Sequence, residues 1–316
     1  MNLLTVNGLS AGYDGKNVIK EICFSMESGK ITGLLGANGC GKTTLIKAVA
    51  NLIPHQGSCC MEGQDTKSLS SRQFAALCGY IPQRSGISID LTLLDVVLMG
   101  FNPDLKFFQQ PSSQMKKEAL HALSMVGLAH RKNDNFQHLS EGQKQLVLLA
   151  RTFAGNRKLL LLDEPESALD FRLRYQVMEL LHEHVRKNQS SALVTLHDSS
   201  LALNYCDTLL VLSDSRLSGI LEPAVTPVRK LELLLSEVYG PVSITVLSNR
   251  SGKRWLTMMK EDVISCKQLQ RLFFLMRTMK NSLAKVHIVF CARLRKQALF
   301  AQPLPPWGLP IRKHCE

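Results

Sequence analysis

The sequence of 316 residues lacks long hydrophobic runs. Its uninterrupted apolar stretches are short, for example residues 159–162, 272–276 and 288–292, and a membrane-spanning helix needs about 18 apolar residues. Residues 1–10 have neither the basic flank nor the apolar stretch of a signal peptide. We therefore expect a soluble, cytoplasmic chain that reaches a membrane only through a partner protein.

Closely spaced cysteine pairs of the C-x-x-C type are also missing. The nine cysteines are scattered and odd in number, which fits a reducing compartment better than a disulfide framework. The same spacing argues against a zinc site.

Acidic residues are absent from positions 263 to 315. Residues 261–316 hold ten Lys and Arg against three acidic residues, which gives +7 of the total net charge of +12. We expect a basic C-terminal extension of uncertain order. Three interpretations stay open: a loosely ordered appendage or read-through extension with no selected function, a helix over residues 266–283 near anionic lipid, and a nucleic-acid-binding element. The last is disfavoured because aromatic residues are not interleaved with the basic ones.

Residues 1–260 show alternating strand and helix patterns. Short strands at 6–10 and 22–26 open the chain as an antiparallel section. The stretch 90–155 is mainly helical, and the order strand, helix, strand elsewhere favours a parallel sheet. The other expected elements are strands at 31–35, 159–162, 192–196 and 209–212, helices at 42–53 (ended by Pro54) and 173–185, and a pair of strands at 244–247 and 255–258.

A glycine-rich segment follows the strand at 31–35. Gly36-Ala37-Asn38-Gly39-Cys40-Gly41-Lys42-Thr43 matches G-x-x-x-x-G-K-[ST] without a mismatch. Glycines let the backbone N–H groups wrap a triphosphate, and the helix that begins at Lys42 directs its positive end toward the phosphates. Lys42 supplies a point charge, and the Thr43 hydroxyl can bind Mg²⁺. The alternative is a Gly-rich strand–helix turn without a ligand.

A second strand, residues 159–162, ends in two carboxylates, Asp163 and Glu164. A buried strand of this kind delivers Asp163 to the carboxyl edge of the sheet, beside the phosphate loop, where it can hold Mg²⁺. Glu164 then suits a general base that positions water for attack on the γ-phosphorus. A plain strand-ending turn, Asp-Glu-Pro, is the competing interpretation.

The segment Leu139-Ser140-Glu141-Gly142-Gln143 precedes an apolar helix. Ser140 and Gln143 form a capping-box pattern, and a helix N-terminus is an anion site. Most such patterns are ordinary caps. Here, however, the motifs together resemble ABC-transporter ATPases over residues 1–260, with Leu139 to Gln143 at the place of the LSGGQ signature. The resemblance implies an α/β fold: a P-loop NTPase core with a mostly parallel sheet, an antiparallel β section and a helical insertion at about 90–155.

The resemblance also assigns roles to isolated residues. Tyr13 matches the aromatic residue that stacks on adenine, and Gln83 the glutamine that reaches Mg²⁺ and the attacking water. Asp170, in residues 167–170, matches the D-loop at the dimer interface, and His197 the switch histidine at the γ-phosphate. The implied catalytic residues are Glu164, His197 and Gln83, the implied metal ligands are Thr43, Gln83 and Asp163, and the implied ATP-binding residues are Tyr13, Gly36, Asn38, Gly39, Cys40, Gly41, Lys42, Thr43, Thr44, Ser140, Gly142, Gln143 and Asp170.

Three positions depart from the family pattern. Glu141 replaces a glycine, and we expect its carboxylate to point away from the phosphates. Glu166 stands where Thr is more common, and Cys40 lies inside the phosphate loop, so alkylation of Cys40 is expected to block nucleotide binding.

The family resemblance further implies cofactors and partners. With ATP and Mg²⁺, each of two subunits sandwiches nucleotide against the signature of its twin, so a second copy is needed. Integral-membrane permease subunits, and indirectly a solute-binding protein, are implied partners at the cytoplasmic face of the cell membrane. Residues 89–100 look like a segment of importers for iron chelates, haem and vitamin B12. Zinc or manganese import, and a soluble ABC ATPase acting on nucleic acid or ribosomes, are the alternatives.

Overall fold

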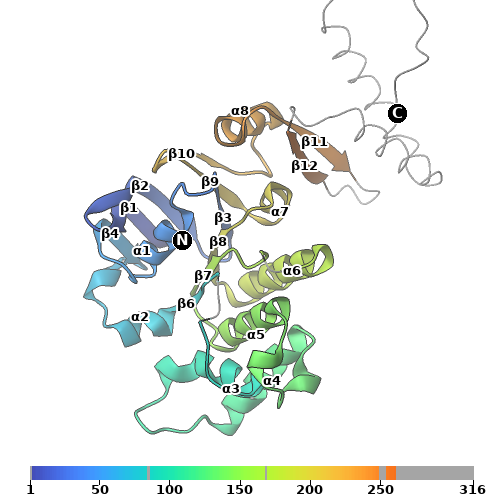
Figure 1. Ribbon diagram of the computed structural model, residues 1–316. Coiled ribbons are helices and arrows are strands. Elements are labelled where there is room, and N and C mark those ends of the chain that lie inside the picture. Colours follow the sequence, from blue (N-terminus) through green and yellow to red (C-terminus); the bar gives the residue numbers. More distant parts are fainter. Residues whose placement is uncertain (1, 84–85, 168, 249–253, 261–316) are drawn as a thin grey trace, which may run out of the picture. The chain divides into compact units, whose positions relative to one another are not determined.

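A six-stranded sheet forms the centre of the computed structural model, which describes residues 2–83, 86–167, 169–248 and 254–260 (Figure 1). The strand order is β10-β9-β3-β8-β7-β6. The four pairings β9–β3, β3–β8, β8–β7 and β7–β6 are parallel, and β10 is antiparallel to β9 at one edge. The strands are β3 (Ile31–Gly36), β6 (Cys78–Ile81), β7 (Leu159–Asp163), β8 (Ser191–Thr195), β9 (Thr208–Ser213) and β10 (Arg216–Leu221).

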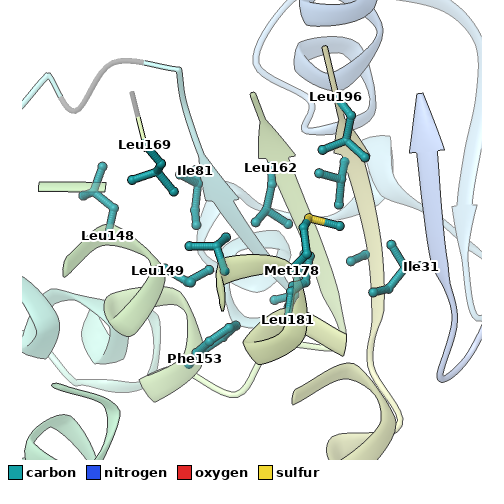
Figure 2. Packing of buried hydrophobic residues seen from close by; sticks show 14 of the residues in the cluster. Ile31, Ile81, Leu148, Leu149, Phe153, Leu162, Leu169, Met178, Leu181 and Leu196 are labelled. Carbon is teal, nitrogen blue, oxygen red and sulfur yellow. The ribbon is translucent and has the colours of Figure 1, made fainter. Parts of the chain in front are cut away.

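This sheet is buried on both faces because its strands are apolar at successive positions. In β7, Leu159 and Leu161 pack into a first hydrophobic core on one face of the sheet, and Leu160 and Leu162 pack into a second core on the other face. Side chains alternate between the faces of a strand, so an unbroken Leu run fits only a sheet that is covered on both sides. Figure 2 shows part of the second core, in which α6 (Phe171–Asn188) lies over the sheet with Met178 and Leu181.

The first core lies between the sheet and an antiparallel section. That section has the order β2-β1-β4-β5, with β1 (Asn2–Tyr13), β2 (Lys16–Glu27), β4 (His55–Met61) and β5 (Gln64–Asp65). The sequence predicted two short strands here, whereas β1 and β2 form one hairpin of twelve residues each. Helix α1 (Lys42–Val49) contributes Leu45 and Ile46 to the same core.

The predicted helical stretch at 90–155 is helical in the structure. It contains α3 (Leu93–Leu98), α4 (Ser113–Met125) and α5 (Glu141–Ala154), with short 3₁₀ turns η2 (Met99–Asp104), η3 (Ala129–Arg131) and η4 (Phe136–His138). It follows η1 (Thr66–Ser68) and α2 (Ser71–Leu77) in the chain. Arg157 joins this part to the sheet region, because its guanidinium binds Asp104 and the carbonyls of Ala76 and Gly100.

The last described part adds α7 (Ser199–Tyr205), α8 (Val228–Tyr239), β11 (Val242–Ser248) and β12 (Arg254–Lys260). β11 and β12 pair antiparallel, which confirms the expected pair of strands. Helix α8 was not predicted. Asn204 of α7 holds β12, because its amide donates to the Leu256 carbonyl and accepts from the Leu256 N–H. The predicted extension of residues 261–316, including the helix at 266–283, lies outside the described residues.

The prediction that the helix starting at Lys42 runs to Ile53 and ends at Pro54 is wrong. Helix α1 ends at Val49. Asn51 has a φ of 55° and donates its N–H to the Ala48 carbonyl, while the Leu52 N–H reaches the Lys47 carbonyl. This is the Schellman arrangement, in which a left-handed residue closes the helix. Leu52 is 57% exposed, so the apolar spacing that suggested more helix is not a buried face.

Candidate functional site

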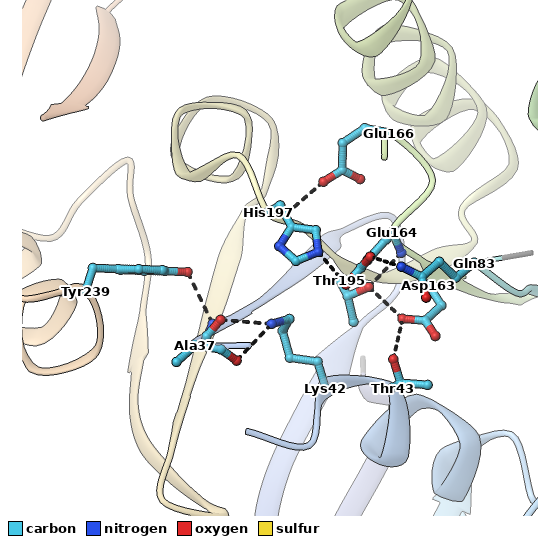
Figure 3. Close-up of polar contacts among 11 residues, drawn as sticks. Ala37, Lys42, Thr43, Gln83, Asp163, Glu164, Glu166, Thr195, His197 and Tyr239 are labelled. Carbon is cyan, nitrogen blue, oxygen red and sulfur yellow. Dashed lines mark hydrogen bonds and ion pairs between the residues drawn. The ribbon is translucent and has the colours of Figure 1, made fainter. Parts of the chain in front are cut away.

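The phosphate loop connects β3 to α1 and leaves little room for side chains. A Cβ on Gly36 would lie 2.5 Å from the Cys40 sulfur and 2.6 Å from the Leu212 carbonyl oxygen. Gly41 has a φ of 108° and directly precedes the helix. Both positions therefore require glycine. The Lys42 ammonium folds over the loop and donates to the carbonyls of Gly36 at 2.9 Å and Ala37 at 3.2 Å (Figure 3).

Asp163 lies beside this loop at the end of β7, as the strand pattern predicted. Its Oδ1 accepts hydrogen bonds from the hydroxyls of Thr43 at 3.2 Å and Thr195 at 2.9 Å. The Thr195 hydroxyl in turn accepts the Glu164 N–H at 2.7 Å. The ends of β7 and β8 and the start of α1 thus meet in one hydrogen-bonded group.

The Glu164 carboxylate is held from two sides (Figure 3). Gln83 Nε2 donates to Glu164 Oε2, and His197 Nε2 lies 2.6 Å from Glu164 Oε1. Glu164 has a φ of 52°, a conformation that is uncommon for a residue with a Cβ and that recurs at functional sites. The three residues come from three separate segments: the loop after β6, the turn after β7 and the turn after β8.

A cavity of about 370 Å³ opens over these groups. Except for Val18, every residue that lines it was predicted from sequence to belong to the site. The lining residues are Val18, Asn38, Gly39, Gly41, Lys42, Thr43, Thr44, Gln83, Glu164 and His197. The structure therefore brings together the phosphate loop, the proposed base and the switch histidine.

Several predicted residues lie elsewhere. Tyr13 lines a different cavity, of about 520 Å³, beside the β1–β2 hairpin. Asp170 caps α6, since its Oδ1 accepts the Leu173 N–H at 2.9 Å. None of the described residues at 139–143 lines the 370 Å³ cavity. Within this one chain, none of these positions lines the cavity over the phosphate loop.

The segment at 139–143 forms the start of α5. Ser140 Oγ accepts the Gln143 N–H, and Gln143 Oε1 accepts the Ser140 N–H, which completes the predicted capping box. Gly142 lies in the first turn. Glu141 is 70% exposed at its side chain and pairs with Lys144 at 2.8 Å, so its carboxylate is held on the helix surface.

Sequence reasoning missed two groups that contact the site. Tyr239 of α8 accepts the Gly36 N–H at 3.3 Å through its hydroxyl, and burial raises the pKa of Tyr239. Glu166 Oε1 accepts a hydrogen bond from the backbone N–H of His197 at 2.8 Å. Glu166 stood out only as a departure from the family pattern, and no local signal marks Tyr239.

Burial also perturbs groups in and beside the loop. Burial raises the pKa of the Cys40 thiol, and the nearby Lys42 charge opposes that change. Burial, with Asp163 as a second cause, raises the pKa of Tyr80 to about 12. Both groups are therefore neutral near pH 7.

No helix among the described residues has the length and apolar character that crossing a membrane requires.

Comparison with known proteins identifies the family. The model of the family described as "ABC transporter" matches residues 19–167. An iron chelatin transport ATP-binding protein of Helicobacter pylori is 34% identical over 239 residues, covering 75% of this chain and 92% of that one. The hemin import ATP-binding protein HmuV of Rhizobium etli is 32% identical over 241 residues, covering 73% of this chain and 90% of that one.

Among solved structures, a metal-chelate type ABC transporter in an inward-facing conformation matches with a TM-score of 0.70 and 26% identity, covering 84% of this chain and 100% of that chain. The phosphate loop, the acidic strand end and these relatives agree, and the chain belongs to the family of ABC-transporter ATP-binding subunits, as an ATPase that couples ATP hydrolysis to transport.

Proposed function

We propose that the chain is the ATP-hydrolysing subunit of an importer for iron-chelate, haem or cobalamin-type cargo, working as one of two identical subunits on the cytoplasmic face of a membrane permease. The observation that carries the hydrolytic part is the Glu164 carboxylate, held between Gln83 and His197 beside the phosphate loop. A carboxylate oriented in this way suits a base that accepts the proton of an attacking water.

The phosphate loop supplies the binding of ATP. Its backbone N–H groups and the start of α1 face the phosphates, and Lys42 exchanges its contacts with Gly36 and Ala37 for phosphate oxygens. Tyr13 stacks on adenine. His197, within reach of Glu164, contacts the γ-phosphate.

The oxygen groups near Asp163 fit Mg²⁺. The Thr43 hydroxyl already contacts the Asp163 carboxylate, and hydroxyl, carboxylate and amide oxygens are the ligands this ion prefers. Thr43, Asp163 and Gln83 would hold the ion, which when bound neutralises charge on the phosphate oxygens.

A second chain completes the site. Ser140, Gly142 and Gln143 at the start of α5 form an anion-binding helix end that is not part of the cavity in its own chain. In a pair, this helix end covers ATP held by the phosphate loop of the twin, with Asp170 at the interface.

Two kinds of observation support the cargo assignment. Residues 89–100 resemble importers for iron chelates, haem and vitamin B12. The relatives from H. pylori and R. etli are described as acting on iron chelatin and hemin. Uptake assays with the permease in vesicles, comparing iron chelates, haem, cobalamin, zinc and manganese, test this assignment. Uptake of zinc or manganese alone would contradict it.

The variant Glu164→Gln tests the hydrolytic role. It keeps the size of the side chain but cannot accept a proton, so we expect ATP turnover to fall by about 100-fold or more while ATP still binds. With ATP and magnesium the variant is expected to accumulate as a closed dimer, measurable by light scattering after gel filtration. Glu21→Gln, a surface change, is the matched control. Near-normal turnover would remove Glu164 from the role. If the variant did not associate even beside the permease, the paired site would be wrong.

A further inference from the structure

Glu166 is a buried carboxyl group without a role in the mechanism above. It lies in the turn between β7 and α6, and it is 1% exposed. Removing a carboxyl group from water is costly unless its oxygens find partners.

One oxygen of this carboxyl has a defined partner. Glu166 Oε1 accepts the backbone N–H of His197 at 2.8 Å, across the gap between two neighbouring strand ends (Figure 3). The other oxygen, Oε2, is buried and makes no hydrogen bond with any described residue. The contact with His197 is therefore the one directional interaction that the Glu166 side chain makes with another residue in the described structure.

Burial raises the pKa of Glu166. The backbone N–H groups of His197 and of Glu166 itself, and the His197 imidazole, oppose that change, while the Glu164 carboxylate adds to it. In either protonation state the carboxyl group keeps an oxygen that accepts a hydrogen bond. A glutamine of the same shape should therefore replace it.

His197 is held at two points by this arrangement. Its backbone N–H binds Glu166, and its ring Nε2 contacts Glu164, two residues earlier in the same turn. The turn after β7 thus carries Glu164, the proposed base, and also binds the backbone of His197, whose ring contacts Glu164. A small shift of such a group can cost a large factor in rate, because catalysis depends on alignment.

We propose that Glu166 is a positioning residue for ATP hydrolysis, which fixes the backbone of His197 so that the imidazole meets Glu164 and the γ-phosphate. This inference rests on the proposed roles of Glu164 and His197. Glu166 acts through His197 and touches neither substrate nor metal.

Two substitutions separate hydrogen bonding from packing. Glu166→Leu keeps most of the volume and removes the acceptor, so we expect kcat to fall by about tenfold or more, with KM for ATP within about twofold of wild type. Glu166→Gln keeps the acceptor and is expected to stay within about twofold in both constants. Thr66→Val, another change at a buried polar side chain, is the control for general effects on folding. If Glu166→Leu does not fold, Glu166→Ala replaces it with the same expectations.

A kcat for Glu166→Leu close to wild type would overturn the proposal. So would equal losses in the Leu and Gln variants, because the acceptor would then not be the cause.

A double-mutant cycle with His197→Ala tests the positioning role of Glu166 separately from the proposed role of His197 in ATP hydrolysis. We expect His197→Ala to lower kcat, and Glu166→Leu to add no more than about twofold in that background, because the residue it positions is gone. A full multiplicative loss in the double variant would overturn the inference alone. Unchanged kcat in His197→Ala would overturn the proposed role of His197 and the inference with it.

Discussion

At the scale of single residues, both the backbone and the side chain of Glu164 are held by contacts with neighbouring segments. Its positive φ is costly by about 1–3 kcal/mol for a residue with a Cβ. The Thr195 hydroxyl offsets part of this by accepting the Glu164 N–H. The carboxylate of this residue contacts Gln83 and His197.

Cys40 gives a residue-scale prediction with a defined pH dependence. The thiolate is the reactive form, and a raised pKa leaves less of it at neutral pH. We expect alkylation of Cys40 to be slow near pH 7, to accelerate as the pH rises beyond about 9, and to be slowed by ATP. Modified protein should lose ATP binding, because the added group occupies the crowded space beside Gly36.

Mass spectrometry of the modified cysteine, with ATP binding measured on the same sample, checks this prediction. The Cys40→Ala variant should keep ATP binding after the same treatment. Unchanged binding by protein fully alkylated at Cys40 would refute the steric explanation.

At the scale of elements, the end of α1 supplies a stability prediction. Asn51 adopts a left-handed conformation that Asn and Gly tolerate better than Ala. Asn51→Ala is expected to lower the free energy of unfolding by about 1 kcal/mol, and Asn51→Gly to change it by less than about 0.5 kcal/mol. Urea unfolding followed by circular dichroism measures both. Equal stability of the Ala and wild-type proteins would show that the turn, not the residue, closes the helix.

A strand that is covered on both faces could be predicted from the sequence, whereas helix α8, with both buried and exposed leucines, could not. Residues 159–162 predicted a strand because both faces of β7 are covered. Helix α8 was missed because its apolar residues do not share one environment: Leu231 and Leu235 are buried, whereas Leu233 is 64% exposed. Leu52 misled the prediction of α1 in a similar way.

For the site, sequence separation decides which features could be predicted. The phosphate loop and the Asp163–Glu164 pair could be predicted because each is a local motif whose chemistry depends on adjacent residues. The contacts of Glu166 with His197 and of Tyr239 with Gly36 could not be predicted. They join segments 31 and 203 residues apart, and only the folded sheet brings these segments together.

At the scale of the whole molecule, residues Met1–Glu261 form one compact unit. Tyr239 contacts the phosphate loop, and Asn204 holds β12 by both backbone groups of Leu256. The α8–β12 part is therefore integrated with the ATPase core.

Two truncations test this integration. A chain that ends at Lys260 should keep ATP binding and a Tm within about 3 °C of the full chain. A chain that ends at Gly240 loses buried Val242, Ile244 and Leu256, each worth about 1.5–3 kcal/mol, and its Tm should fall by more than about 5 °C. Thermal scans with and without ATP measure both. Loss of ATP turnover and of permease binding on truncation at Lys260 would instead assign a function to residues 261–316.

The absence of residues 139–143 from the lining of the cavity has a genetic consequence. If each ATP site takes part of its residues from the second subunit, an inactive subunit also impairs the active subunit with which it pairs. In a cell that expresses both alleles equally, only a minority of assemblies would contain two sound copies. Alleles that fold and pair but cannot turn over nucleotide should therefore behave as dominant, whereas alleles that never fold should be recessive.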